Sequence, residues 1–551
     1  MTLPALPCEI VYKILSYVPL RELKYLFRRL PLDDLLRLVI GTILYERVVV
    51  RPSSCYSMDY YHQILPDELH ELSKEKSPPK VQFLKIDGKC PPAIASGYLE
   101  SIDKVSLLVD TIDDYRANAR LDNVVELELL SASLFTMKDC PPRLESITLR
   151  YNENDLSPVL TGWPKSLKKL DISFCQDVSK ITLPRNLEEL SCHYCSKVWT
   201  EYPPTLKSLD LSLNFGLKFD QFILPDLLDK LRLRNCHIDN IDWLTKKWPI
   251  ELRCLDIGNN PQIFMNEVTF PESLVTLNIL LCKIKSLNSV KFPSLLIELC
   301  VADNELETLE NVNFPNLSVL DISRWDHYED VQINKICQAK FPTSLRRLFA
   351  DGHKIQDWSE VTFPNELVEL TIDSTEDLEK LVFPPNLESL QLNLFSDSKP
   401  CYSNLHLPPT LQLLLLHGGL SIDFDWNLPN LSFMSVVDVV GPIQIPSSVK
   451  ELELETVDFT TFESLIIPQG VEELTITYPL SAYPDTVIDL QIQYCDPSKP
   501  LILPLQLRSL CLFAGTLGPI SKEQIVLPPS IQQISGDFEL EFIETINDLG
   551  I

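Results

Sequence analysis

The residues in this sequence whose types and spacing best fit chemistry are a short cysteine and histidine run, Cys192-His193-Tyr194-Cys195. Two cysteines three positions apart are spaced like half of a zinc site. No second pair of ligands stands nearby in the sequence, and His70-Glu71 lacks the second histidine of an HExxH metal helix. Glycine is scarce, at 15 of 551 residues, and neither GxGxxG nor GxxxxGK occurs. We therefore expect no catalytic residue, no metal and no cofactor.

A repeat runs through most of the chain and includes these cysteines. Each copy has an aromatic or aliphatic residue, proline, two variable residues and then L-x-x-L-x-L, as in Trp163 to Ile172. Between residues 144 and 531 the copies follow one another at a mean step of about 21.5 residues. Three weaker copies begin at residues 81, 102 and 124, so that about 22 units extend from residue 81 to residue 536. A fixed period of this length is typical of a solenoid.

The spacing within one copy predicts its local structure. The last two apolar residues of L-x-x-L-x-L are two positions apart, so they point to one face of an extended strand and their neighbours point to the other. Proline has no backbone N–H to donate and favours extended chain before it, which places it ahead of the strand. One unit cannot bury its apolar face alone, so the units must stack with their strands in parallel, about 4.8 Å apart.

The repeat resembles the leucine-rich repeat, L-x-x-L-x-L-x-x-N/C-x-L. Eight successive copies have asparagine or cysteine at the N/C position of that family: Asn152, Cys175, Cys195, Asn214, Cys236, Asn260, Cys282 and Asn304. The resemblance implies an α/β solenoid, a leucine-rich-repeat horseshoe of about 22 short units, in which this residue satisfies backbone groups at the bend after each strand. We call this series the Asn/Cys ladder. It favours a structural role for Cys192 and Cys195 over zinc binding.

The ladder is interrupted in the second half of the chain. The next four copies have other residues at the N/C position: Trp325, His353, Thr375 and Phe395. We therefore expect the chain to bend differently after the strands of this half.

Residues 1–50 differ from the repeat in period and in charge. Residues 1–51 contain eight Lys and Arg against five Asp and Glu, whereas the whole chain has a net charge of −29. Apolar residues at helical spacing, such as Ile10, Ile14 and Val18, predict three short helices. Residues 51–80, which are punctuated by proline and serine, are expected to form a connector to the solenoid at 81–536. Residues 537–551 would form a C-terminal cap or tail.

The run from Leu6 to Leu23 resembles the opening of the F-box, L-P-x-E-[IL]-x-x-x-I-L-S-[YF]-[LV]-P-x-x-[DE]-L. The later Val-Cys-[RK]-x-Trp stretch of that family is absent. The resemblance implies a small three-helix segment that docks on the Skp1 adaptor through seven residues: Leu6, Pro7, Ile10, Ile14, Leu15, Pro19 and Leu23. An amphipathic cap over the open edge of the first repeat is the alternative.

A candidate partner-binding surface is predicted in the second half of the solenoid. The residues that flank the last two apolar positions of each unit face solvent, and most are polar. Large apolar or aromatic groups occupy several of these positions: Phe349, Leu413, Leu415, His417, Phe433 and Val437. Glu451, Glu453, Glu455 and Glu473 follow and form an acidic ladder. An apolar patch bordered by charge is typical of an interaction site, although inward folding or a covering loop is the alternative.

Charge and cysteine content restrict the partners and the compartment. Asp and Glu number 77 against 48 Lys and Arg, which gives a pI of about 4.7. This charge repels nucleic acid and anionic membranes, so we expect neither as a partner. Fifteen cysteines, an odd number, and the lack of a signal-peptide run favour a reducing compartment, the cytoplasm or the nucleus.

Together these features predict a protein that is not an enzyme. The two resemblances imply a substrate-recognition adaptor of an SCF (Skp1-cullin-F-box) ubiquitin ligase, which binds a protein target with a basic surface on its solenoid. The alternative is a non-catalytic scaffold in a fixed assembly, such as a kinetochore complex. Bacterial effector ubiquitin ligases also have proline-anchored repeats, but their catalytic domain follows the repeats. Only about 15 residues follow the last unit here.

Overall fold

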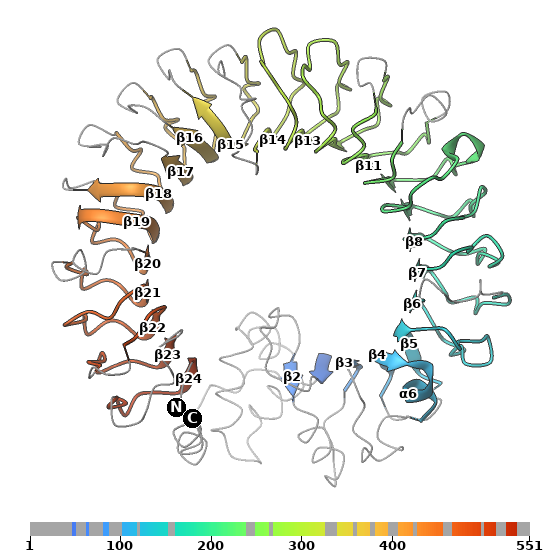
Figure 1. Ribbon diagram of the computed structural model, residues 1–551, viewed down its shortest axis with the longest axis horizontal. Helices are drawn as coiled ribbons and strands as arrows, with labels where there is room; N and C mark the ends of the chain where they lie inside the picture. Colours follow the sequence, from blue (N-terminus) through green and yellow to red (C-terminus); the bar gives the residue numbers. More distant parts are fainter. Residues whose placement is uncertain are drawn as a thin grey trace, which may run out of the picture. The chain divides into compact units, whose positions relative to one another are not determined.

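Two compact units divide the chain, Met1–Asn260 and Pro261–Ile551, and each contains parallel strands (Figure 1). The computed structural model describes residues 47–50, 62–64, 81–87, 102–117, 122–151, 160–238, 248–263, 268–324, 339–355, 361–374, 381–394, 406–422, 427–455, 465–496, 501–513 and 525–536. The predicted Skp1-binding residues Leu6, Pro7, Ile10, Ile14, Leu15, Pro19 and Leu23 lie outside the described residues, as do residues 537–551.

The first unit is a stack of short parallel strands. Its elements are β1 (Arg47–Val50), β2 (His62–Ile64), β3 (Phe83–Asp87), β4 (Lys104–Thr111), α6 (Ile112–Ala117), β5 (Val124–Ser131), β6 (Ser146–Arg150), β7 (Lys169–Ser173), β8 (Glu189–His193), β9 (Ser208–Asp210), η1 (Phe219–Gln221), β10 (Lys230–Arg232) and β11 (Cys254–Asp256). From β3 to β11 each strand pairs in parallel with the next one in the chain.

The second unit continues the pattern with longer strands in its middle. Its strands are β12 (Thr276–Asn278), β13 (Glu298–Cys300), β14 (Val319–Asp321), β15 (Arg347–Ile355), β16 (Glu369–Ser374), β17 (Ser389–Leu394), β18 (Leu413–Ile422), β19 (Phe433–Ile443), β20 (Glu451–Glu455), β21 (Glu473–Ile476), β22 (Asp489–Ile492), β23 (Ser509–Leu512) and β24 (Gln533–Gly536). All successive pairs from β12 to β24 are parallel.

The repeat predicted from sequence is confirmed as a parallel-strand, leucine-rich-repeat-like solenoid. Every unit predicted between residues 81 and 536 contains one strand, from β3 to β24. Within each unit of the structure the strands line the inner side, and the segments that return to the next strand lie outside them (Figure 1). The outward faces of successive strands therefore adjoin one another and form a continuous surface within each unit.

The sheet of the first unit begins before residue 81. β1 pairs with β3 on one side and with β2 on the other, in parallel in both cases. These two strands fall at the end of the expected helical segment and within the expected connector. The run Val48-Val49-Val50 explains β1, because β-branched side chains favour extended chain.

The core forms from the same position of each repeat. Leu170, Leu190 and Leu209 are paired in register on β7, β8 and β9, and all three are fully buried. Burial of each such side chain stabilises the fold by about 1.5–3 kcal/mol relative to exposure. Along β7 and β8, the residue that follows each of these leucines points away from the core, and the residue after it is buried again. This is the alternation expected of a strand.

The Asn/Cys ladder of the first half binds backbone groups of neighbouring turns. The Asn260 Oδ1 atom accepts hydrogen bonds from the backbone N–H groups of Cys236 and Ile238, at 3.0 and 3.1 Å. The Asn260 Nδ2 atom donates to the carbonyls of Leu233 and Ile257, at 2.9 and 2.8 Å. The ladder residues that lie among the described residues are buried, and Asn152 lies outside them.

Asparagine and cysteine have different roles in this ladder. Asn214 accepts a hydrogen bond from the backbone N–H of Cys195, and Asn304 accepts one from the backbone N–H of Cys282. The asparagine of one turn thus satisfies the backbone of a cysteine in the preceding turn, as Asn260 does for Cys236.

The residue just before each ladder position from Cys175 to Asn304 has an uncommon backbone conformation. Phe174, Tyr194 and Leu213 have φ values of +61°, +54° and +63°. This left-handed conformation is unfavourable for bulky residues. It turns their backbone N–H groups toward the next turn, so that Phe174 donates to the carbonyl of His193 and Tyr194 donates to that of Leu213. A hydrogen bond between turns therefore compensates for the backbone strain.

His353 replaces asparagine where the ladder is interrupted. Its Nε2 atom lies 2.6 Å from the carbonyl oxygen of Ile322, so Nε2 carries the proton and donates it. This carbonyl occupies the same place in its turn as the Leu233 carbonyl that Asn260 binds. His353 therefore makes one of the hydrogen bonds that asparagine makes at this position, the one to the carbonyl of the preceding turn. Its Nδ1 atom has no hydrogen-bond partner among the described residues. Trp325, Thr375 and Phe395 lie outside the described residues.

In the described part of the chain, no helix has both the length and the apolar character needed to span a bilayer.

Candidate functional site

The candidate surface is the outward face of β18 and β19. Along β18, Leu414 and Leu416 point into the core, and the residues between and beside them point the other way. Five outward-facing side chains are half-buried: Leu413, Leu415 and His417 on β18, and Phe433 and Val437 on β19. Successive side chains of a strand point to opposite faces. Because the two leucines of L-x-L point into the core, the five side chains beside them lie on the open face.

The strand register joins these five residues into one surface, which we call the β18–β19 patch. Leu413 pairs with Phe433, and His417 pairs with Val437. Side chains at paired positions of neighbouring strands are close enough to contact one another. The serine opposite Leu415, Ser435, is small and buried, so it does not interrupt the apolar surface.

Phe349, the sixth residue of the predicted surface, lies apart from the β18–β19 patch. It is on β15, where it pairs with Thr371 of β16. Thr371 pairs with Gln391, and Gln391 pairs with Leu415. Three strand steps at about 4.8 Å place Phe349 about 14 Å from the row of β18. Polar residues occupy the interval, so Phe349 does not belong to the same apolar surface.

The acidic ladder directly borders the β18–β19 patch. Glu451 pairs with Phe433, and Glu455 pairs with Val437. Glu451 also pairs with Glu473, and Glu473 pairs with Asp489 of β22. Burial raises the pKa of Glu451, and the neighbouring charges of Glu473 and Glu453 raise it further. The carboxylates therefore oppose one another's ionisation on adjacent strands.

Among the described residues, no cation balances these carboxylates on the same face. The outward positions of β18 to β22 hold no Lys or Arg, and no ion pair reaches Glu451, Glu453, Glu455 or Glu473 within the described part of the chain. Lys450 lies at the rim beside them, where it pairs with Glu472 at 2.9 Å.

Several charges on the corresponding face of the first unit form ion pairs with one another. Arg150 pairs with Glu128 at 3.0 Å, and Lys169 pairs with Glu189 at 3.4 Å. A hydrogen bond to Asp210 raises the pKa of His193. Charges that already have partners attract a charged partner weakly.

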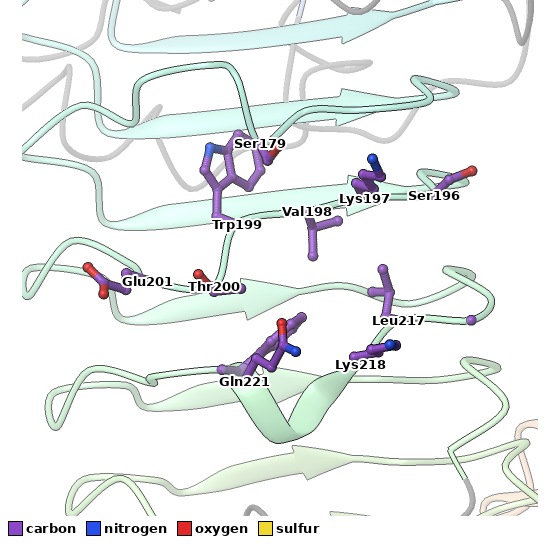
Figure 2. A pocket seen from close by; sticks show the side chains of 12 residues that line it. Ser179, Ser196, Lys197, Val198, Trp199, Thr200, Glu201, Leu217, Lys218 and Gln221 are labelled. Atoms are coloured by element: carbon purple, nitrogen blue, oxygen red, sulfur yellow. The ribbon is translucent and has the colours of Figure 1, made fainter.

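A pocket of about 630 Å³ lies elsewhere, on the returning loops of the first unit (Figure 2). Trp199 is buried in its wall, and its Nε1 atom donates to the Ile181 carbonyl at 2.7 Å. Lys197 and Lys218 lie on one side of the pocket in Figure 2, and Glu201 lies on the other. The residues that line the pocket include no histidine or cysteine. Sequence analysis missed this pocket because its residues belong to loops outside the L-x-x-L-x-L pattern.

The cysteine pair that has the spacing of a metal site is part of the core. Cys192 is buried on β8, and Cys195 is a buried member of the Asn/Cys ladder. The backbone N–H of Cys195 donates to Asn214 Oδ1 at 2.6 Å, and its thiol contacts the His193 carbonyl at 3.4 Å. Among the described residues, no group of three or more His, Cys, Asp or Glu side chains gathers as metal ligands would.

Comparison with known proteins adds likenesses of fold. No protein-family model matches the chain, and no curated protein matches it. Among solved structures, CroV588, described as a circular LRR protein, is 17% identical, with 86% of this chain and 84% of that chain covered and a TM-score of 0.45. The TLR13–ssRNA13 complex matches at 17% identity, with coverages of 82% and 76% and a TM-score of 0.47. The mouse RP105/MD-1 complex matches at 15%, with coverages of 86% and 91% and a TM-score of 0.45.

Proposed function

We propose that this leucine-rich-repeat-like solenoid is a non-catalytic adaptor that holds a target protein on its strand face. The observation that carries the proposal is the β18–β19 patch, where register pairs Leu413 with Phe433 and His417 with Val437. Half-exposed apolar side chains on an otherwise polar sheet face favour association with another protein. Such a protein needs no catalytic group, because its role is to raise the local concentration of its target.

The finer part of the proposal is that residues 1–50 dock the solenoid on Skp1 within an SCF ubiquitin ligase. Its support is the F-box-like run from Leu6 to Leu23. The target would have a basic surface, because the chain has a net charge of −29 and attracts cationic groups over a distance set by ionic strength. The same charge disfavours nucleic acid and anionic membranes as partners. This role would be carried out in the cytoplasm or the nucleus.

Skp1 binding tests the F-box-like segment. The full-length chain should bind purified Skp1, and the double variant Ile14→Asp/Leu15→Asp should weaken binding at least about 100-fold, because buried apolar anchors at an interface contribute several kcal/mol. Isothermal titration calorimetry measures both affinities. The control is Lys13→Asp, which alters charge at a variable position of the F-box pattern and should change affinity by less than about threefold.

The result also separates the two interpretations of the protein. Absence of Skp1 binding by the wild-type chain would overturn the ligase role and leave a scaffold in a fixed assembly. Equal losses in Lys13→Asp and the double variant would show that the F-box alignment of this segment is wrong. Thermal unfolding of each variant, followed by circular dichroism, shows whether the solenoid is intact.

A further inference from the structure

The surface that includes β18 to β22 combines two kinds of recognition in a fixed order. The β18–β19 patch presents Leu413 and Phe433, and the acidic ladder begins on the very next strand. Four strand steps at about 4.8 Å separate β18 from β22, so the whole surface is about 19 Å long. The apolar and acidic parts are thus close enough to contact one short segment of a partner.

The energetics of the acidic ladder call for a cationic partner. Glu451 and Glu473 are paired on adjacent strands, and like charges directly opposite one another destabilise a sheet. A partner that brings Lys or Arg to this face relieves the repulsion and gains from the Coulomb attraction. A second copy of this chain is a poor occupant, because each copy has a net charge of −29.

The spacing defines how such a segment would be arranged. In extended chain, alternate side chains on one side are about 6.6–7 Å apart. We consider a segment that runs perpendicular to the strands, with an apolar side chain over Leu413 and Phe433. Its side chain two residues later then lies over β20. The next residue on that side lies between β21 and β22, near Glu473 and Asp489.

We propose that the outward face of β18 to β22 binds an extended protein segment with the pattern apolar-x-basic-x-basic, or its reverse. The apolar residue contacts the β18–β19 patch, and the two basic residues lie over the acidic ladder. This inference rests on the proposed role of the solenoid in target binding and specifies the chemistry of the bound segment.

The test uses a random dodecapeptide library displayed on phage and selected on the full-length protein. The selected peptides should be enriched in the apolar-x-basic-x-basic pattern. Each is then synthesised with fluorescein, and its Kd is measured by fluorescence anisotropy at 50 and 200 mM NaCl. We expect the Kd to rise about five- to tenfold over this range, because exposed ion pairs are screened by salt.

Matched variants locate the peptides on the surface. The triple variant Glu451→Gln/Glu453→Gln/Glu473→Gln should weaken binding at least tenfold, and Phe433→Ser should do the same. Glu298→Gln is the control for the charge, because Glu298 occupies the corresponding outward position on β13. Phe349→Ser is the control for the aromatic group, because Phe349 lies three strands from β18. Both controls should change Kd by less than twofold.

Stability measurements keep the result interpretable. The glutamine variants relieve repulsion on the open face, so their unfolding temperatures should stay at or above that of the wild type. A variant that binds weakly while it retains its unfolding temperature has lost recognition rather than the fold.

Several outcomes would overturn the inference. These are an absence of enrichment, enriched peptides without Lys or Arg, affinities unchanged in the triple variant, and self-association of the chain that the triple variant abolishes. Skp1 binding is measured on the same preparations, so the two proposals fail separately. Retained Skp1 binding with failed peptide recognition removes only this inference, whereas the reverse result removes the ligase role.

Discussion

Replacing Asn260 with alanine should lower the free energy of unfolding by about 4 kcal/mol or more. The asparagine side chain is completely buried, and its amide satisfies the N–H groups of Cys236 and Ile238 and the carbonyls of Leu233 and Ile257. Alanine leaves all four backbone groups in the core without this partner. Each buried group left unsatisfied costs about 1–3 kcal/mol. Urea unfolding followed by circular dichroism measures the loss.

Two control variants test whether burial and the amide account for this effect. Asn186→Ala removes an exposed amide that donates to the Lys165 carbonyl at 3.3 Å, and it should cost less than about 0.5 kcal/mol. Cys236→Ala removes a weakly bonding thiol from the ladder position of the preceding turn and should cost clearly less than Asn260→Ala. Similar losses for Asn186→Ala and Asn260→Ala would contradict the ladder as the origin of stability at this bend.

Acidification from pH 7 to pH 4 should remove about 3 kcal/mol of folding stability through His353 alone. Burial, together with the nearby charge of Arg324, lowers the pKa of His353 from 6.5 to about 4, although the hydrogen bond to the Ile322 carbonyl opposes the shift. Between pH 6.5 and pH 4, His353 is therefore mostly protonated in the unfolded chain and mostly neutral in the folded chain. The contribution of His353 to stability is complete above pH 6.5 and is lost as the pH falls through this window.

The His353→Asn variant isolates this contribution from the many carboxylates that titrate nearby. Asparagine does not titrate, so the difference in unfolding free energy between variant and wild type should shrink by about 3 kcal/mol from pH 7 to pH 4. Urea unfolding at four pH values gives the two curves. Parallel curves would show that His353 does not remain neutral in the folded protein.

His193 supplies a control of opposite sign. A hydrogen bond to Asp210 raises the pKa of His193, so folding favours its protonated form. Its contribution is present at low pH and is lost as the pH rises through the folded-state pKa. The His193→Asn variant should therefore lose more stability at low pH than at neutral pH, in contrast to His353→Asn.

The local features of the fold could be predicted from the sequence. The period of about 21.5 residues and the L-x-x-L-x-L spacing predicted parallel strands with alternating core and open faces, and β3 to β24 confirm them. The resemblance to the leucine-rich repeat identified Cys195 and Asn214 as ladder residues and favoured a structural role for the cysteine, and both residues are buried and joined by a hydrogen bond. These features depend on residues within one or two turns, where strand geometry alone decides which side chains share a face.

Features that depend on several turns could not be predicted from the sequence. The prediction grouped Phe349 with the residues of the β18–β19 patch, because the repeat shows which face a residue shares. The step of about 21.5 residues already implies two intervening copies, but only the in-register pairing of β15 to β18 shows that Thr371 and Gln391 form polar rows between Phe349 and Leu415. The strands β1 and β2 were also missed, because they precede the first recognisable copy of the repeat.

By itself, the sequence determined the repeating strand, its buried leucines, the place of the Asn/Cys ladder and the acidic character of the chain. The tertiary structure alone decided which amide satisfies which backbone, which apolar residues adjoin on β18 and β19, and which carboxylates of the described strands have no cation beside them. The physical reason is the distance along the chain over which each feature is determined. Alternation along a strand is fixed by local backbone geometry, whereas pairing between turns depends on register and on the length of each returning segment.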